Sequence, residues 1–315
     1  MDFFLDRSEV VNRWNRDYPA RLTIKSGDTV SFEMRDSSDG QVSPDMTASD
    51  FGKIDKSRIH ALTGPVCVEG AEPGDRLVLE ILDYQHEGWG WSGLVDGLGL
   101  LADDFSGSFL HTWRFEGNET RSMPGLTIPL RPFCGIIGVQ PEEKGEFRTR
   151  PPGKFGGNLD VRHLVAGSRL HLPVQIPGAG LCAGDAHAAQ GDGEVCLNGM
   201  EAPMTVRMKV ELQKDRPLPG PYLECPGELE PPEFAEHGYH VFIESDPDPR
   251  EASKRVVRRA IDYLVKRLGL SREQAYITCS AVIRLKISQL VNEPTMTISG
   301  YFPEAVFDER STVTP

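Results

Sequence analysis

Short apolar runs separated by turns dominate the first two thirds of the chain. Residues 22–24 and 30–34 form two such runs on either side of the turn Ser26-Gly27-Asp28. The turn Glu72-Pro73-Gly74-Asp75 stands before a similar run at 76–82. Glycine supplies the positive φ that a tight turn requires, and short apolar or alternating runs between turns are typical of strands. The pattern predicts strands over all three runs.

The middle of the chain has the same character. Residues 134–139 form an apolar run with two glycines, and residues 169–174 alternate. The chain holds 32 glycines and 24 prolines, many of them at the ends of such runs, as expected for strands joined by turns. We therefore predict a mainly β fold with a sandwich-like or barrel-like body, and no helix before about residue 248.

A change of period marks the C-terminal part of the chain. Apolar residues recur there at helical spacing and share one face, namely Val256, Val257, Ala260, Ile261, Leu264, Val265 and Leu268. Asp248 suits the N-cap, Pro249 the first turn and Gly269 the C-terminal stop. A second helix is predicted over 271–281, followed by strands at 284–291 and 295–301. These elements form a small α/β tail in the order helix, helix, strand, strand.

A proline-rich stretch separates the two parts. Prolines cluster at 217–221 and again at 226–232, which is typical of a linker or an extended loop. We predict a β-rich catalytic body over residues 1–215, a linker or wrapping loop over 216–247, and an α/β tail over 248–315 that packs on the body.

Charge and composition exclude several kinds of partner. The chain has 47 acidic and 34 basic residues, a formal net charge of −13, which repels nucleic-acid phosphates and anionic lipids. Residues 1–20 lack the apolar run of a signal peptide, and no stretch reaches the roughly 20 apolar residues of a membrane helix. The six cysteines include no CxxC pair. We expect reduced thiols, a cytoplasmic location, and neither nucleic acid nor membrane as partner.

Two segments gather polar residues and glycine where a core strand should be apolar, at 156–160 and at 184–195. Within the second segment, Asp185 and His187 are two residues apart, so extended backbone points both to one face. Asp192 and Glu194 form another such pair. The spacing predicts that these ionisable groups converge.

A carboxylate, an imidazole and a second carboxylate make a ligand set suited to zinc or another divalent first-row ion. Asp185 and His187 are two of the predicted ligands, and Asp160 on the neighbouring strand is the third. Glu194 is the predicted general base, with Asp192 as a second catalytic carboxylate. The predicted substrate contacts are the amides of Asn158 and Gln190 and the side chains of Trp89 and Trp91, which share one face and can wall a small pocket.

Structural explanations compete with these assignments. The same Asp, His and Gly residues also suit a simple turn in which carboxylates cap backbone amides. His60 is interpreted as a loop histidine outside the site. Cys134 and Cys182 raise the alternative of a thiolate nucleophile, but Cys134 stands in an apolar strand where burial raises the pKa of a thiol. The glycine-rich loops lack the pattern of a phosphate-binding loop.

Residues 184–194 read Gly-Asp-x-His-Ala-x-Gln-Gly-Asp-Gly-Glu, which resembles the signature of the acetamidase/formamidase family. Further blocks resemble the family in the same order, at 26–30, 62–71, 89–91, 131–139, 156–160 and 285–289. The resemblance implies hydrolysis of short aliphatic amides to carboxylate and ammonia, a β-rich fold with a small α/β part, and a homo-oligomer. It also implies a site around Asp160, Asp185, His187 and Glu194.

We therefore predict an amidase that acts on a small amide of the acetamide or formamide type through a metal-activated water. One alternative is a non-catalytic β-sandwich that binds a small ligand or a metal through the same loops, because a family can keep its framework and lose its reaction. The other alternative is an amidase that uses a non-metal nucleophile.

Overall fold

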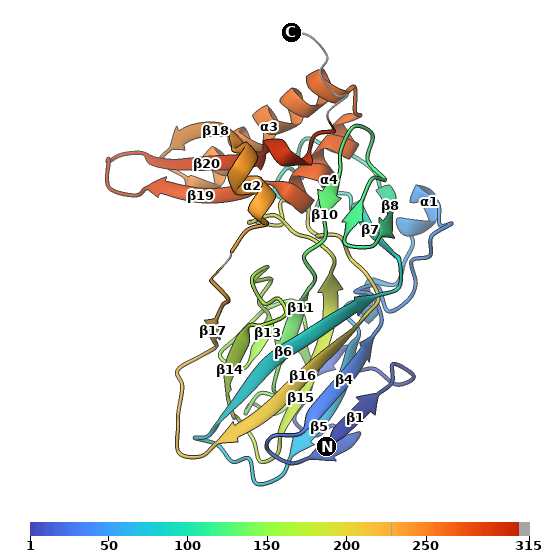
Figure 1. Cartoon of the computed structure of the whole chain (residues 1–315), viewed down its shortest axis with the longest axis vertical. Helices are drawn as coiled ribbons and strands as arrows, with labels where there is room; N and C mark the ends of the chain where they lie inside the picture. The colour runs from blue at the N-terminus through green and yellow to red at the C-terminus, as the bar shows by residue number, and fades with distance from the viewer. Residues whose placement is uncertain (228, 309–315) are drawn as a thin grey trace.

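The computed structural model describes residues 1–227 and 229–308, and it confirms the mainly β prediction. Two sheets form the elongated lower part of the molecule in Figure 1. The first has the order β1 (Asp2–Leu5), β4 (Thr29–Met34), β16 (Met204–Gln213), β6 (Arg76–His86), β14 (Arg169–Pro173), β17 (Tyr222–Glu224). The second has the order β13 (Gly156–Asn158), β11 (Phe133–Gly138), β15 (Ala179–His187), β5 (Leu62–Val68), β3 (Leu22–Ile24).

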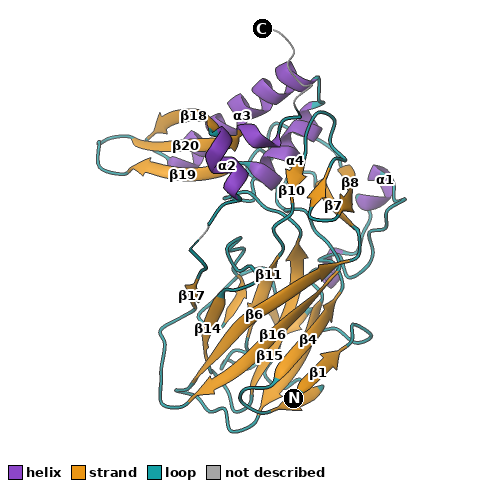
Figure 2. Ribbon diagram, in the orientation of Figure 1, coloured by secondary structure: helices purple, strands orange, loops and turns teal. Residues whose placement is uncertain are grey.

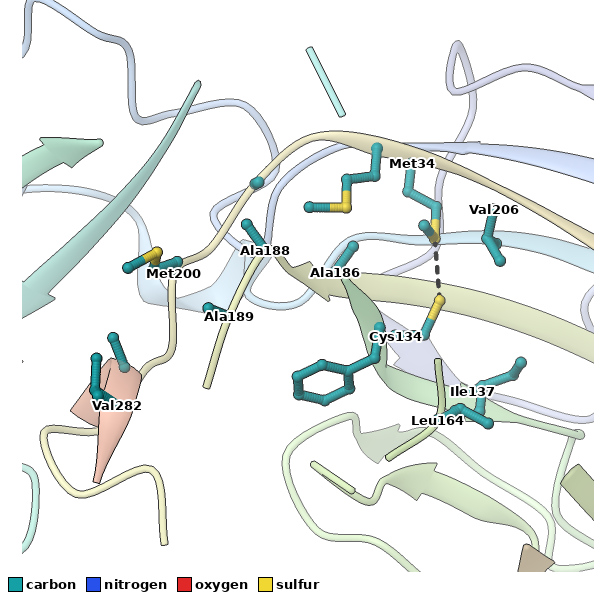
Figure 3. Packing of buried hydrophobic residues seen from close by; sticks show 14 of the residues in the cluster. Met34, Cys134, Ile137, Leu164, Ala186, Ala188, Ala189, Met200, Val206 and Val282 are labelled. Atoms are coloured by element: carbon teal, nitrogen blue, oxygen red, sulfur yellow. Dashed lines mark hydrogen bonds between the residues drawn. The ribbon is translucent and has the colours of Figure 1, made fainter. Parts of the chain in front are cut away.

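Side chains of both sheets share one buried core, so the body is a sandwich. Figure 3 shows part of this core, where Cys134 of β11 and Ala186 of β15 lie near Met34 of β4 and Val206 of β16. The Sγ atom of Cys134 is 3.8 Å from the Sδ atom of Met34. Successive side chains of a strand point to opposite faces. Because Ala186 faces the core, its neighbours Asp185 and His187 on β15 point to the other face of the sheet.

The upper part of the molecule combines residues from the middle and the end of the chain (Figures 1 and 2). A four-stranded sheet has the order β10 (Ile128–Pro129), β9 (Glu119–Thr120), β8 (Phe109–Glu116), β7 (Trp89–Leu94), and a three-stranded sheet has the order β18 (Tyr239–Asp246), β20 (Met296–Pro303), β19 (Arg284–Gln289). Two helices, α3 (Pro249–Leu268) and α4 (Arg272–Val282), pack together beside them. In Figure 1, strands β7 to β10 thus lie in the upper part of the molecule, near helix α4.

The predicted tail helices are confirmed together with their caps. The side chain of Asp248 accepts a hydrogen bond from the Arg250 amide at the start of α3, and Gly269 ends the helix in the left-handed conformation. Ser271 and Gln274 form a capping box at the start of α4. The apolar stripe of α3 packs on β18 and β20, which buries Val256 and Ile261 completely.

Other local predictions were wrong. Short helical turns occur before residue 248, namely α1 (Ala48–Phe51), η1 (Lys56–Arg58) and α2 (Pro232–His237), and η2 (Glu304–Val306) follows the last strand. Residues 216–247, predicted as a linker or loop, contain β17, α2 and β18. Strand β18 pairs along its whole length with β20, so the tail sheet begins inside the predicted linker. The division at 215 and 248 stays a prediction.

The remaining strand pair, β2 (Arg13–Trp14) with β12 (Phe147–Arg148), lies outside the larger sheets. Among residues 1–227 and 229–308, no helix is both long enough and apolar enough to cross a bilayer.

Candidate active site

Two polar residues at the end of β15 and one after β13 meet over the strand between them. The Nε2 atom of His187 is 3.5 Å from the Oδ1 atom of Asp185. Asp160 can offer a ligand oxygen within 4.8 Å of a ligand atom of each. Strand β11 pairs with β13 on one side and with β15 on the other, which brings the two acidic residues to adjacent positions. The structure therefore brings together the three predicted ligands.

Gly135 of β11 forms the floor under this cluster. A Cβ atom at this position would lie 2.7 Å from Oδ1 of Asp160 and 3.0 Å from Oδ2 of Asp185. Any larger residue would push into both carboxylates, because real Cβ atoms do not approach other atoms this closely. Glycine is thus the residue that lets the two acidic side chains approach each other across the strand.

Two glutamates complete the cluster. The Oε1 atom of Glu201 is 3.0 Å from Nε2 of His187, and the Oε1 atom of Glu194 is 4.0 Å from the same nitrogen. Glu201 forms β-bridges with both His187 and Trp91, which fixes its backbone between β15 and β7. Glu194 was predicted from the sequence, whereas Glu201 was not.

The backbone at the cluster is unusual. Asp160, Asp185 and Glu194 have φ angles of 49°, 53° and 43°. Residues other than glycine seldom adopt the left-handed conformation, and such positions concentrate at functional sites where surrounding structure holds them. Of the four carboxylates of the cluster, all but Glu201 are therefore oriented by a backbone conformation that costs free energy.

Burial governs the protonation of these groups. Burial raises the pKa of Asp160 to about 7, and the charge of Asp185 adds to the shift. Burial raises the pKa of Glu201 to about 7 as well. The pKa of Glu194 is raised well above its ordinary value by burial and by the charge of Asp160. The cluster thus holds more carboxylates than the nearby positive charge can keep ionised.

His187 responds in the opposite direction. Burial alone would lower the pKa of its imidazole, but the carboxylates of Glu201 and Asp185 raise it well above the ordinary value. The pKa of Asp185 is lowered although burial opposes this, because His60 and His187 stand beside it. Electrostatically, the cluster favours a positive charge at its centre.

Gln190 sets the orientation of the histidine. Its Oε1 atom is 2.7 Å from Nδ1 of His187, and its Nε2 atom donates a hydrogen bond to the backbone carbonyl of Asp160 at 3.1 Å. Because the amide oxygen accepts from Nδ1–H, Nε2 is the ring nitrogen of His187 that faces the carboxylates. Gln190, predicted to contact substrate, lies behind the histidine instead.

Three buried oxygens at the cluster have no hydrogen-bond partner among the described residues, namely Asn158 Oδ1, Asp160 Oδ1 and Glu201 Oε2. A fourth buried atom, His187 Nε2, lies 3.0 Å from Oε1 of Glu201 but makes no hydrogen bond of good geometry. Buried polar atoms are normally paired, so these atoms are set out for an occupant. Three of them are oxygens and the fourth is an imidazole nitrogen, a donor set suited to a divalent cation. The residues present therefore fit a metal ion.

Asp185, Glu194 and Glu201 of the cluster line a cavity of about 450 Å³, whereas Asp160 and His187 lie behind its lining. Asn158 and Trp91 line this cavity, as predicted for substrate contacts, and so does His60, which was left out of the predicted site. The Nε2 atom of His60 is 3.9 Å from Oδ2 of Asp185. Trp89 does not line the cavity and packs against a neighbouring apolar cluster.

Asp192 is directed away from the cluster. Its Oδ1 atom accepts a hydrogen bond from Nε of Arg162 at 2.8 Å, and Arg162 also pairs with Glu230. The loop after β15 is not extended, so the expected same-face pairing of Asp192 with Glu194 does not occur. The structure thus gives Asp192 an ion pair in place of the predicted position beside Glu194.

The thiol alternative finds no support in these surroundings. Cys134 and Cys182 are buried, and burial raises the pKa of each thiol to about 12. Both stay protonated near neutral pH and pack as small apolar side chains.

Comparison with known proteins identifies the family of this chain. The sequence model of the Acetamidase/Formamidase family matches residues 3–146 and 142–309. The chain belongs to the acetamidase/formamidase family. A formamidase from Methylophilus methylotrophus is 30% identical over 370 aligned residues, covering 95% of this chain and 90% of that protein. An acetamidase from Mycolicibacterium smegmatis is 30% identical over 341 residues, covering 84% of each.

Among solved structures, a gamma lactamase from Delftia acidovorans matches with a TM-score of 0.90 and 28% identity, over 100% of this chain and 95% of that one. The predicted family and fold are therefore confirmed. As a member of the acetamidase/formamidase family, the chain is an amidase that hydrolyses short amides.

Proposed function

We propose that the amidase reaction takes place at the cluster of Asp160, Asp185, His187, Glu194 and Glu201, with the help of a divalent metal ion. The observation that carries the proposal is the convergence of these groups on unpartnered buried atoms at one side of a cavity. Titratable groups with strongly shifted pKa values in a cavity are candidates for catalysis.

Asp160, Asp185 and His187 would hold the ion, and zinc is the first ion to test. A divalent ion supplies positive charge that polarises an amide carbonyl and lowers the pKa of a water molecule to about 7. Gln190 holds the imidazole so that Nε2 faces inward. Glu201 adds negative charge within 3.0 Å of that nitrogen, which strengthens the attraction for a cation.

Glu194 is the proposed proton carrier. Its side chain is 22% exposed and borders the cavity, whereas the side chain of Glu201 is only 3% exposed. A carboxylate with a raised pKa accepts a proton from the attacking water and returns it to the leaving nitrogen at near-neutral pH. The amide of Asn158, which also borders the cavity, orients the substrate.

Ammonia release tests the reaction, and metal removal tests the ion. We expect protein purified without chelator to release ammonia from acetamide or formamide, to lose this activity on dialysis against a chelator, and to regain it when zinc is added. Metal content is determined on the same samples. A cyclic amide belongs in the panel because a relative carries the name gamma lactamase.

Activity that survives complete metal removal would contradict the metal-assisted mechanism and leave a carboxylate-only reaction. Absence of ammonia from every amide, with metal bound, would contradict the assignment of the cluster as the active site.

We also propose a homo-oligomer, supported by exposed apolar side chains on the tail sheet. Ile243 of β18 is 54% exposed and Ile287 of β19 is 63% exposed, and Val291 beyond β19 is 81% exposed. The three-stranded sheet projects from the molecule in Figure 1, and exposed apolar groups of this kind mark interfaces.

Light scattering tests this assembly. We expect the native chain to exceed the monomer mass of 34.9 kDa, and the double variant Ile243→Lys, Ile287→Lys to shift toward it. Phe4→Lys, which changes an exposed apolar residue on β1, is the control. A native chain of monomer mass, or a variant with unchanged mass, would contradict this interface.

A further inference from the structure

The cavity is much larger than an acetamide molecule. Its volume is about 450 Å³, whereas one water molecule, a single heavy atom with its hydrogens, occupies about 30 Å³ of the liquid. The four heavy atoms of acetamide fill roughly a quarter of this space by that measure. A cavity of several hundred Å³ is typical of sites for larger organic ligands.

An apolar wall begins beside the carboxylate cluster. Trp91 and Phe51 pack edge to face with ring centroids 5.3 Å apart, and both line the cavity together with Ile54, Val95 and Leu98. Such a wall offers nothing to the polar amide group. It suits a hydrocarbon chain attached to the amide.

Four basic residues stand at the same cavity. Arg13, Lys56, Arg148 and Arg150 all line it, and three of them are exposed. Within the described part of the chain, none of the four has a carboxylate partner. This is unexpected in a protein with 47 acidic residues and a net charge of −13, since most of its other described arginines form an ion pair with a carboxylate.

The strand register adds a second observation. Arg13 of β2 lies directly opposite Arg148 of β12. Like charges directly opposite in an antiparallel pair are destabilising. Arg150 follows two residues after Arg148, so a third guanidinium is added at the same cavity. Arg13 donates only to the backbone carbonyls of Asn12 and Ser57, so an anion bound between these guanidinium groups would offset their repulsion.

We propose that the enzyme recognises amides whose acyl chain ends in a carboxylate, that is, monoamides of dicarboxylic acids. This inference rests on the amidase reaction at the carboxylate cluster. The amide group meets that cluster, the methylene chain lies along the apolar wall, and the distal carboxylate meets Arg13, Arg148 and Arg150. Hydrolysis consumes one water, breaks the C–N bond, and yields the dicarboxylate and ammonium.

The experiment compares two substrates of the same shape. Adipamate carries a carboxylate at the far end of a four-methylene chain, and 6-methylheptanamide carries an uncharged isopropyl group in its place. We expect kcat/KM for adipamate to exceed that for the neutral amide by at least about tenfold, since an ion pair of this kind is a charge-assisted contact. Isothermal titration calorimetry of both compounds reports binding separately from turnover.

Variants connect this preference to the basic residues. In Arg148→Gln with Arg150→Gln, the ratio of the two kcat/KM values should fall to near one. Arg216→Gln removes an exposed arginine that does not line the cavity, and it should keep the native ratio. High salt should reduce the native ratio because screening weakens ion pairs.

The substrate ratio and the effect of the double variant each test the proposal. A native ratio near or below one overturns the proposal, and so does a high ratio that the double variant retains. If no amide is turned over, the assignment of the cluster as the amidase site fails. Calorimetry then still tests recognition of the distal carboxylate. Tighter binding of adipamate than of the neutral amide supports the proposal, and equal binding overturns it.

Discussion

Replacing Glu194 by Gln should lower kcat for acetamide by about 10²- to 10⁴-fold, the usual contribution of a positioned acid–base group. The amide keeps the size of the side chain but cannot accept a proton from water. Because Glu194 is not one of the three proposed metal ligands, metal content should stay near one equivalent. KM should change less than kcat, since the interaction lost belongs to the transition state.

Asp192→Asn is the matched control for Glu194→Gln. It makes the same chemical change two residues away, at a carboxylate that pairs with Arg162. We expect its kcat to stay within a few-fold of the native value. Equal losses in both variants would show that the loop, rather than the proton carrier, had been disturbed, and an unchanged Glu194→Gln would contradict the role of Glu194.

The second large effect is expected at Glu201. Glu201→Gln removes a buried negative charge 3.0 Å from Nε2 of His187 while keeping the shape of the side chain. Carboxylates around a metal site typically contribute 10- to 100-fold to metal affinity or activity. We therefore expect zinc affinity and kcat/KM to fall by about this factor, and added zinc to restore part of the activity.

Glu72→Gln, at an exposed carboxylate outside the cavity, serves as the control, and thermal unfolding is followed for both proteins. A Glu201→Gln protein with native zinc affinity and native kcat/KM would contradict the role of Glu201. Loss of activity with an unchanged zinc affinity would instead make this residue part of the reaction itself.

Periodicity predicted the fold well wherever packing reinforces local preference. The helix at 249–268 has an N-cap, a terminal glycine and an apolar stripe, and all three agree. Strand β18 was not predicted, because the prolines at 226–232 led to a loop prediction for all of residues 216–247. Residues 239–246, which form the strand, lie beyond these prolines. Its pairing with β20 is a long-range contact that no local pattern reveals.

The site was predicted in part for a similar reason. Asp185, His187 and Glu194 fall within eleven residues, so one motif indicated all of them. Glu201 stands in Met-Glu-Ala-Pro, without polar neighbours, and only its bridges to His187 and Trp91 bring it to the cluster. His60 likewise reaches the cavity from a distant loop.

Two assignments differ because side-chain direction depends on the local backbone. Asp192 was expected beside Glu194 from an extended spacing, but the chain turns there and the carboxylate meets Arg162 instead. Gln190 was expected at the substrate, but it hydrogen-bonds His187 from behind. The residue types were informative about the chemistry, while their positions depended on tertiary structure.

The glycine floor has a consequence for how the protein can diversify. Because Gly135 has no room for a Cβ atom beneath Asp160 and Asp185, the reacting end of the cavity tolerates little sequence change. Other parts of the lining come from short turns and the small β2–β12 pair, with side chains such as Phe51 and Arg148. Substitutions of such side chains leave the glycine floor intact, so new amide substrates are most accessible to directed evolution through libraries confined to those lining positions.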